Sequence, residues 1–180
     1  MQIDSYLNGV LHIKPKVHQD HRGHFFESFR KDALQEFGVD LEFVQDNQSL
    51  SQKNILRGLH YQTPPYAQGK LVRVIKGAVR DVVLDIRKSS STYGQFKVFD
   101  LTEQNFEMLY VPPGFAHGFA TLENYTIFTY KCTDYYNPES EGGVLWSSPE
   151  LEIPWGIEDP VLSEKDKHLT SFSDFQSPFE

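Results

Sequence analysis

Apolar and polar residues alternate along most of the chain, in short runs that end at glycine or proline. A period of two is typical of a β-strand, in which successive side chains point to opposite faces. The run Val79–Arg87, for example, places Val82 and Leu84 on one face and Asp81 and Val83 on the other. Further runs of this kind cover Lys70–Lys76, Phe96–Leu101, Phe106–Val111, Phe115–Leu122 and Thr126–Cys132. Short strands at this spacing predict an antiparallel sandwich or barrel.

Helix signals are confined to one short segment. Asp32–Phe37 begins with an acidic residue, carries Leu34 and Phe37 three positions apart, and is followed by Gly38, a common helix stop. Most of the remaining chain consists of strand-forming runs between turn residues. We therefore expect an all-β fold with short peripheral helices.

Three regions can be distinguished along the chain. Residues from about 1 to 45 are predicted to form an extended N-terminal arm, about 46 to 137 the barrel, and about 138 to 180 a tail. The tail keeps Trp146 and Trp155, so we expect it to pack on the barrel. The 180 residues are expected to form a single domain. Because such arms often cross to a partner and sheet edges must be covered, we predict a homodimer.

Charge and cysteine content narrow the class of protein. The 17 Lys and Arg against 25 Asp and Glu give a net charge of -8, which disfavours a nucleic-acid binder. The single cysteine, Cys132, cannot form an internal disulfide or a zinc ribbon. Neither a run of about 18 apolar residues nor a signal peptide is visible, so we expect a cytoplasmic protein without a membrane span. Aromatic residues make up 14% of the chain, which suits a β-rich core or a pocket that stacks on rings.

The first segment with candidate chemistry is Leu56–Gln62, with the sequence Leu-Arg-Gly-Leu-His-Tyr-Gln. Arg57 and His60 could supply a base beside an anion clamp. Strict alternation places these two side chains on opposite faces, so a shared site requires a twist or bulge at Gly58. The alternative is a hydrogen-bonded strand histidine with a surface arginine.

The second segment, Val111–Phe119, contains the pattern Pro-x-Gly-x-x-His, which ends at His117. This pattern resembles the second motif of the cupin superfamily, small double-stranded β-helix barrels. The first motif of metal-binding cupins supplies His-x-His, where this chain has His60 and Gln62. Two imidazoles without a third strong ligand make a poor metal site. We therefore expect a metal-free barrel in which both histidines are free for acid–base or hydrogen-bonding roles.

Several other residues have both a structural and a functional interpretation. Asp166 follows Ser163 at the spacing of a helix capping box, but its carboxylate could also orient a histidine. Tyr130 shares a face with Phe128 and is either a core residue or a general acid that protonates an enolate. Four basic residues are either scattered solvated charges or a site for a phosphorylated ligand: Arg22, Arg57, Lys70 and Arg73.

Together these segments resemble one family, the dTDP-4-dehydrorhamnose 3,5-epimerases, which are metal-free cupin epimerases of sugar nucleotides. Seven similar blocks follow in the family's order, which argues against a chance match. The blocks are Asp20–Glu27, Phe43–Ser51, Leu56–Gln62 with Gln68–Val72, Asp81–Arg87, Pro112–Phe119, Tyr130–Tyr136 and Lys165–Asp166. One departure is Thr170, where the family usually has proline. The resemblance implies a cupin-type jelly-roll barrel.

The resemblance also implies a role for each matched residue. His60 would be the catalytic base with Asp166 as its partner, and Tyr130 the acid on the opposite face of the sugar. Lys70 would be the cation beside the developing oxyanion. The other matched positions bind the nucleotide-sugar or line its site: Arg22, Glu27, Gln45, Asn47, Arg57, His117, Tyr136, Glu141 and Lys165.

The implied reaction suits these residue types. The substrate, dTDP-4-dehydro-6-deoxy-D-glucose, has a C4 ketone, and its C3 and C5 hydrogens lie α to that ketone. Loss of either proton leaves an enolate, and return of a proton from the other face inverts the carbon. The product is dTDP-4-dehydro-L-rhamnose, in dTDP-L-rhamnose biosynthesis. We expect an isomerase without metal or cofactor, and no G-x-G-x-x-G motif is present.

Three alternatives remain open at this point. The first is a related 3-epimerase or 5-epimerase, and the second is an enzyme for CDP-sugars. Both would share His60 and Tyr130, so the motifs do not separate them. The third is a cupin that only binds a sugar or a partner, although such a module has no need of a His–Asp pair.

Overall fold

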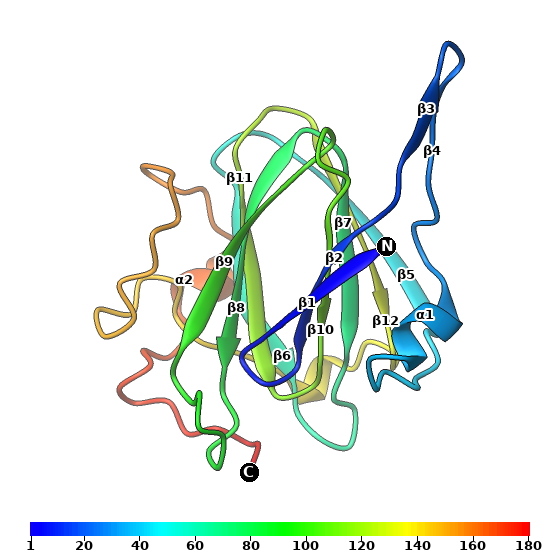
Figure 1. Ribbon diagram of the computed structural model, residues 1–180. Coiled ribbons are helices and arrows are strands. Elements are labelled where there is room, and N and C mark those ends of the chain that lie inside the picture. Colours follow the sequence, from blue (N-terminus) through cyan, green and yellow to red (C-terminus); the bar gives the residue numbers. More distant parts are fainter.

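Two antiparallel sheets face each other in the computed structural model, which describes residues 1–180 (Figure 1). The first sheet contains β1 (Gln2–Tyr6), β2 (Val10–Lys14), β5 (Gln45–Ser51), β7 (Lys70–Lys76), β10 (Met108–Val111) and β12 (Thr126–Cys132). The second contains β6 (Leu56–Gln62), β8 (Ala78–Asp85), β9 (Phe96–Thr102), β11 (Phe115–Thr121) and β13 (Glu141–Gly143). Their spatial orders are β1-β2-β10-β7-β12-β5 and β13-β6-β11-β8-β9. This arrangement confirms the predicted all-β jelly-roll barrel.

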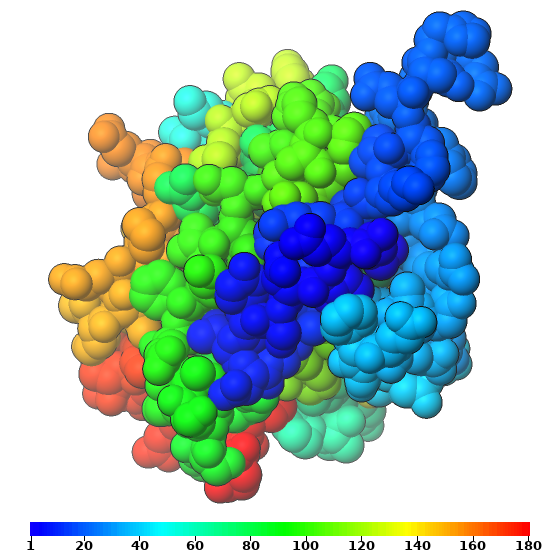
Figure 2. Space-filling view, in the orientation of Figure 1, coloured from blue at the N-terminus to red at the C-terminus, as the bar shows by residue number.

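The remaining elements lie around the barrel. A small hairpin of β3 (His18–Asp20) and β4 (Gly23–Phe25) projects from the body, as Figure 2 shows. Three short helices complete the structure: α1 (Lys31–Gln35), the 3₁₀ turn η1 (Pro138–Ser140) and α2 (Glu164–Lys167). The longest of them has five residues, and none could cross a bilayer.

The strands agree with the alternation in the sequence, with differences at their ends. The predicted strand Val79–Arg87 stops at Asp85, because the Arg87 side chain and main chain both bond to the Asp85 carboxylate. The predicted strand Phe106–Val111 begins only at Met108, because Phe106 has a φ of 57°. The first two strands also belong to the barrel: β2 pairs with β10, so only residues 15–44 form an arm outside the sheet.

The apolar face of each strand packs into one of three clusters. The cluster between the two sheets includes Val83 and the fully buried Phe128. A second cluster, on the outer face of the five-stranded sheet, joins Val82 to Trp155 of the tail. A third joins Leu34 of α1 to the outer face of the six-stranded sheet. Burying one large apolar side chain contributes about 1.5–3 kcal/mol, so these clusters hold the tail and the arm against the barrel.

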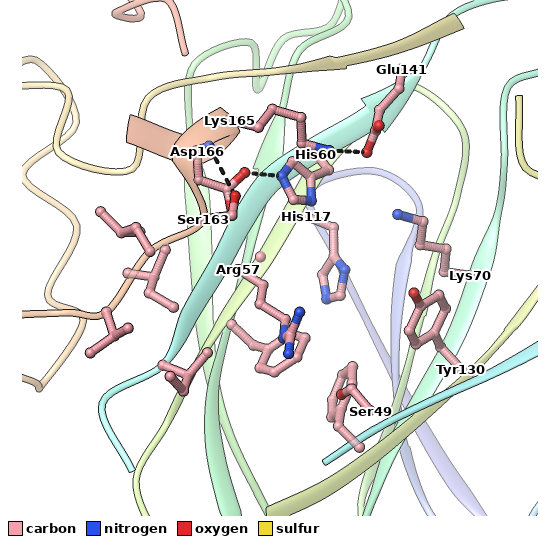
Figure 3. A pocket seen from close by; sticks show the side chains of 17 residues that line it. Ser49, Arg57, His60, Lys70, His117, Tyr130, Glu141, Ser163, Lys165 and Asp166 are labelled. Carbon is pink, nitrogen blue, oxygen red and sulfur yellow. Dashed lines mark hydrogen bonds and ion pairs between the residues drawn. The ribbon is translucent and has the colours of Figure 1, made fainter. Parts of the chain in front are cut away.

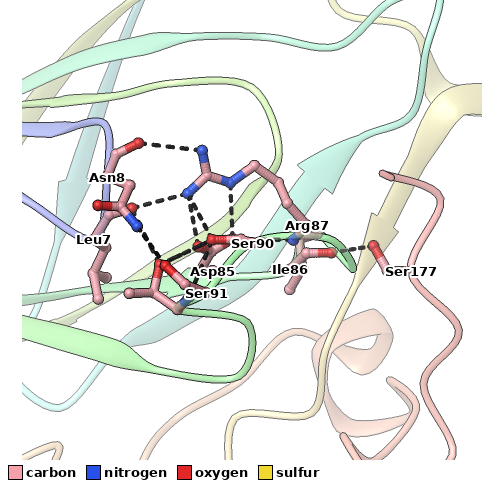
Figure 4. A network of polar contacts seen from close by, with 9 residues as sticks. Leu7, Asn8, Asp85, Ile86, Arg87, Ser90, Ser91 and Ser177 are labelled. Carbon is pink, nitrogen blue, oxygen red and sulfur yellow. Dashed lines mark hydrogen bonds and ion pairs between the residues drawn. The ribbon is translucent and has the colours of Figure 1, made fainter.

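A polar network ties the N-terminal turn to the end of β8 (Figure 4). The fully buried Asp85 accepts hydrogen bonds from Arg87, Ser90 and Thr92. The Arg87 guanidinium also donates to the main-chain oxygen of Leu7. Although burial alone would raise it, these hydrogen bonds hold the pKa of Asp85 below its usual value. The carboxylate therefore stays charged and holds two distant segments together.

Candidate active site

A cavity of about 580 Å³ opens between the two sheets (Figure 3). Its walls come from both sheets and from the tail. The polar and charged residues that line it are Ser49, Arg57, His60, Lys70, His117, Tyr130, Glu141, Ser163, Lys165 and Asp166. The structure therefore gathers most of the predicted site residues around one space.

The bulge required at Gly58 is present. Along β6 three steps separate Arg57 from His60, whereas their partners on β11, Phe119 and His117, are two steps apart. Gly58 has a φ of 125°, and a Cβ at this position would lie 2.5 Å from the Cα of the opposite glycine on β11. Only glycine fits such a backbone approach, and the extra residue turns both side chains toward the cavity. Arg57 is exposed, as the alternative of a surface arginine expected, but its side chain lines the cavity and donates to Ser51.

His60 forms a pair with Asp166. Asp166 Oδ1 lies 2.5 Å from His60 Nε2, and only 2% of Asp166 is exposed. The main chain of Asp166 also donates to Ser163 Oγ, so the predicted helix cap and the predicted His–Asp pair are both present. Burial alone would raise the pKa of Asp166, but the bonds from His60 and Ser163 hold it below its usual value. The carboxylate fixes a proton on Nε2 and leaves Nδ1 free to accept one.

A second pair, which the sequence did not lead us to expect, joins His117 to Asp81. Both oxygens of the fully buried Asp81 lie within 3.0 Å of His117 Nε2. The alternation in the sequence could have indicated this pair, because it places Asp81 on the same strand face as the apolar Val83. A carboxylate on an inward face needs a partner, because an unpaired buried charge is costly.

Lys70 and Tyr130 occupy the opposite wall from His60. Lys70 makes no ion pair within 4.0 Å, and its Nζ lies 6.0 Å from the centre of the Tyr130 ring. Burial lowers the pKa of Lys70, and nearby Cys132 and Glu141 oppose that shift. Burial also raises the pKa of Tyr130, so the phenol keeps its proton at neutral pH. The wall therefore offers a lysine without an ion-pair partner beside a protonated phenol.

Three residues meet at one rim of the cavity. Glu141 accepts a hydrogen bond from Lys165 at 2.6 Å and another from the Tyr136 hydroxyl at 2.9 Å. Burial alone would raise the pKa of Glu141, but these two partners hold it below its usual value. Tyr136 is 54% exposed, so its ring offers a flat surface at the entrance.

The geometry can support proton transfer on two faces of one ligand. His60 comes from the five-stranded sheet and Tyr130 from the six-stranded sheet, and they face each other across the cavity in Figure 3. A base on one wall and an acid on the other is the arrangement that inversion of a carbon acid requires.

Comparison with known proteins decides the family. The model of the dTDP-4-dehydrorhamnose 3,5-epimerase family matches residues 4–174. The chain belongs to this family. A dTDP-4-dehydrorhamnose 3,5-epimerase from Shigella flexneri is 47% identical over 173 residues, which cover 96% of this chain and 96% of that one. The resemblance inferred from the motifs is confirmed.

Two solved epimerase structures superpose over nearly the whole chain. The dTDP-4-dehydrorhamnose 3,5-epimerase from Bacillus anthracis, with TDP and PPi bound, is 43% identical at a TM-score of 0.91. The alignment covers 93% of this chain and 97% of that one. The dTDP-6-deoxy-D-glucose-3,5-epimerase from Legionella pneumophila, in complex with dTDP-4-keto-L-rhamnose, is 44% identical at a TM-score of 0.90. That alignment covers 95% and 93% of the two chains.

Not every residue matched to the epimerase motifs reaches the cavity. Arg22 lies at the tip of the β3–β4 hairpin, where it bonds Asp20. Glu27 follows that hairpin and lies 3.6 Å from Arg30. Neither residue lines the cavity of its own chain.

Gln45 and Asn47 lie on β5, next to the cavity. The Gln45 amide donates to Asn47, and its oxygen accepts from the Tyr136 main chain at the rim. Asn47 pairs in register with Tyr130. Neither residue lines the cavity itself.

Gln62, at the position of the second histidine in metal-binding cupins, is engaged by the main chain. Its amide donates to the carbonyls of Tyr66 and Tyr135, and its oxygen accepts from Asn137. The structure contains no group of three His, Cys, Asp or Glu side chains that could hold a metal ion. Gln62 thus has a structural role, since it fastens the loops at the end of β6.

Proposed function

We propose that this epimerase inverts C3 and C5 of dTDP-4-dehydro-6-deoxy-D-glucose and releases dTDP-4-dehydro-L-rhamnose. The observation that carries the proposal is the placement of His60 and Tyr130 on opposite walls, with Lys70 beside them. The family and the identity to named 3,5-epimerases support the same substrate.

In the proposed mechanism His60 removes a proton α to the C4 ketone. Nδ1 accepts the proton, and the Asp166 carboxylate stabilises the imidazolium that forms. The resulting enolate carries its charge on the C4 oxygen, where the Lys70 ammonium stabilises it. One such donor contributes ~10²–10³-fold to the rate, and each positioned acid or base ~10²–10⁴-fold.

Tyr130 then donates a proton to the opposite face of the carbon. Its pKa, raised by burial, suits a donor that must be protonated before the enolate exists. The His60 proton then returns to solvent, the Tyr130 phenolate takes a proton from solvent, and the cycle repeats at the second carbon. No electron transfer occurs, so the residues of this chain supply all the chemistry.

The remaining matched residues are proposed to hold the nucleotide. Arg57, His117 and Lys165 are the cations or donors around the cavity that suit a diphosphate. Tyr136 offers a ring for stacking on the base, and Gln45 and Asn47 offer amides at the same rim. In this scheme Glu141 holds Lys165 and Tyr136 in place until the nucleotide arrives.

The proposal includes a homodimer. The β3–β4 hairpin carries Arg22 at its tip and the 69% exposed Phe25 on β4, and neither residue lines the cavity of its own chain. The outer face of β5 and β7 exposes Leu50 and Ile75, which are 59% and 41% accessible. A second copy seated on this face would cover these side chains, and Arg22 and Glu27 of each chain would then reach the nucleotide bound by the other chain. Light scattering at micromolar concentration is expected to give twice the 20.8 kDa chain mass, and a monomer would contradict the proposal.

We also propose that the enzyme acts in the cytoplasm. Its substrate carries a charged diphosphate, which does not cross a membrane unaided. Cell fractionation with activity assay is expected to recover the epimerase with cytoplasmic enzymes.

Incubation with dTDP-4-keto-6-deoxyglucose in D₂O, followed by NMR of the sugar, tests the function. The expected result is deuterium at both C3 and C5 with inversion at both carbons. Deuterium and inversion at one carbon alone would indicate a monoepimerase. Deuterium and inversion in a CDP-sugar, but not in the dTDP-sugar, would show that the enzyme acts on CDP-sugars. Absence of deuterium from both sugars would show that the protein binds sugars without epimerising them.

A further inference from the structure

Ser49 lines the cavity but has no part in the mechanism described above (Figure 3). Its Oγ is the one buried side-chain oxygen or nitrogen in the structure that lacks a hydrogen-bond partner. A buried polar group without a partner is costly, and native proteins rarely keep one without a function. The position of this hydroxyl in a substrate cavity indicates that its partner arrives with the substrate.

The register of β5 places Ser49 next to the acid. Alternate residues of this strand face the cavity side, and Asn47 pairs with Tyr130 while Ser49 pairs with Phe128. The following inward residue, Ser51, already accepts a hydrogen bond from Arg57. The Ser49 hydroxyl therefore remains free to bind a ligand. Ser49 is the next inward-facing residue on β5 after Asn47, the register partner of Tyr130.

The apolar surroundings of Ser49 allow its single hydroxyl to discriminate between ligands. The rings of Phe119 and Phe128 lie 4.1 Å apart and are 5% and 0% exposed, so this end of the cavity has an apolar floor. In such surroundings a hydrogen bond is stronger than in water, and few other groups compete for it. Rotation about χ1 moves Oγ between staggered positions, and no existing hydrogen bond is lost.

We propose that Ser49 is a specificity-determining residue that binds a ring hydroxyl of the hexose, at C2 or C3. This inference rests on the proposed function. The hexose has hydroxyls only at C2 and C3, because C4 is a ketone and C6 a methyl group. His60, Lys70 and Tyr130 serve the reacting carbons and the C4 oxygen. Ser49 is left to bind the hydroxyl and thereby to orient the ring against Tyr130.

The test compares wild type and Ser49→Ala on three substrates: the natural sugar, its 2-deoxy analogue and its 3-deoxy analogue. On the natural sugar, Ser49→Ala is expected to lower kcat/KM about ten-fold, because the substrate hydroxyl loses its partner. On the analogue that lacks the bound hydroxyl, wild type and variant are expected to be equally slow. The analogue that shows this equality identifies the carbon. Inversion at C5 serves as the readout for the 3-deoxy sugar, whose C3 is no longer a stereocentre.

Two further variants complete the experiment. Ser49→Cys keeps the side-chain size but donates weakly, so it is expected to show the ten-fold loss even if the alanine variant does not fold. Ser89→Ala, in an exposed loop, is the matched control and is expected to match wild type on all three sugars.

Each other outcome overturns the inference. An unchanged kcat/KM on the natural sugar would mean that Ser49 binds no substrate hydroxyl. An equal loss on all three sugars would mean that Ser49 acts through packing. Failure of the proposed function is distinguishable, because wild type itself would then leave the natural sugar unchanged.

Discussion

The carboxylate of Asp166 lies 2.5 Å from the imidazole of His60, although 106 positions of sequence separate the two residues. The main chain of Asp166 caps its own helix through Ser163, while the side chain reaches His60. The two roles use different atoms, so the side chain can be changed without removal of the cap. This separation makes Asp166 a clean position at which to test the mechanism.

Asp166→Asn is expected to lower kcat by ~10²-fold or more, because an amide does not stabilise the imidazolium that proton abstraction creates. The fold should survive, since Asn has the same shape and the cap to Ser163 remains. Steady-state kinetics and a melting curve measure the two effects. Asp159→Asn, at an exposed position of the tail, is the control and should change neither. A kcat near that of wild type would remove Asp166 from the catalytic pair.

Lys70→Ala is expected to lower kcat ~10²-fold or more, because the C4 enolate loses its nearby cation. Lys76→Ala changes an exposed lysine on the same strand and should leave kcat and KM unchanged. A rise in KM with an unaltered kcat would instead assign Lys70 to ground-state binding, such as a phosphate contact.

The division of labour between His60 and Tyr130 can be followed by deuterium exchange. His60→Ala should abolish both product and deuterium uptake at C3 and C5, because no enolate forms without the base. Tyr130→Phe keeps the ring but removes the phenol proton, so His60 can still exchange protons on its own face. The expected signature is a higher ratio of exchange to inverted product. A modest rate loss at constant ratio would make Tyr130 a packing residue, and complete loss of exchange would make the phenol a stabiliser of the enolate.

Activity is expected to survive prolonged treatment with a chelator. The position that would supply a further ligand is Gln62, whose amide is bonded to three main-chain groups. Turnover should therefore be equal before and after dialysis against EDTA. Loss of turnover that one added divalent ion restores would refute the expectation.

The stability of the barrel should depend on the charge of Asp85. Its pKa in the folded state lies below the unfolded value of about 4, so its contribution is present above that pH and is lost as pH falls through the folded pKa. Asp85→Asn is expected to lower the free energy of unfolding at pH 7 by about 3 kcal/mol, because Arg87 loses its buried partner. It should also weaken the acid dependence of stability below pH ~4. Urea titrations at several pH values measure both effects.

Asp100→Asn provides the comparison for Asp85→Asn. Asp100 pairs with Arg80, but its side chain is 52% exposed. Such surface pairs contribute about 1 kcal/mol or less. An Asp85→Asn variant as stable as Asp100→Asn would show that the network in Figure 4 contributes little.

Local periodicity predicted the faces of the barrel strands well. Tyr130 was expected beside Phe128 on one face, and both line the cavity. The need for a bulge at Gly58 also followed from counting, because Arg57 and His60 could share a site in no other way. These features depend on residues within a few positions of one another, so the sequence contains them directly.

Contacts between distant segments could not be predicted in the same way. Nothing near Asp81 indicates His117 as its partner, and nothing near β2 indicates that it pairs with β10. The rim of Tyr136, Glu141 and Lys165 is likewise assembled by the docked tail. Periodicity fixes which way a side chain faces, whereas the partner it meets depends on how the sheets close.

The position of Asp166 on the docked tail has a consequence for synthesis on the ribosome. His60 emerges long before Asp166, and at 5–20 residues per second the interval is roughly 5–20 s. During that interval a nascent barrel can form most of its sheets but holds a histidine without its carboxylate. In the proposed mechanism full activity therefore begins only when α2 has been made and has packed beside β6, because α2 and the residues before it complete the cavity wall as well as the His–Asp pair.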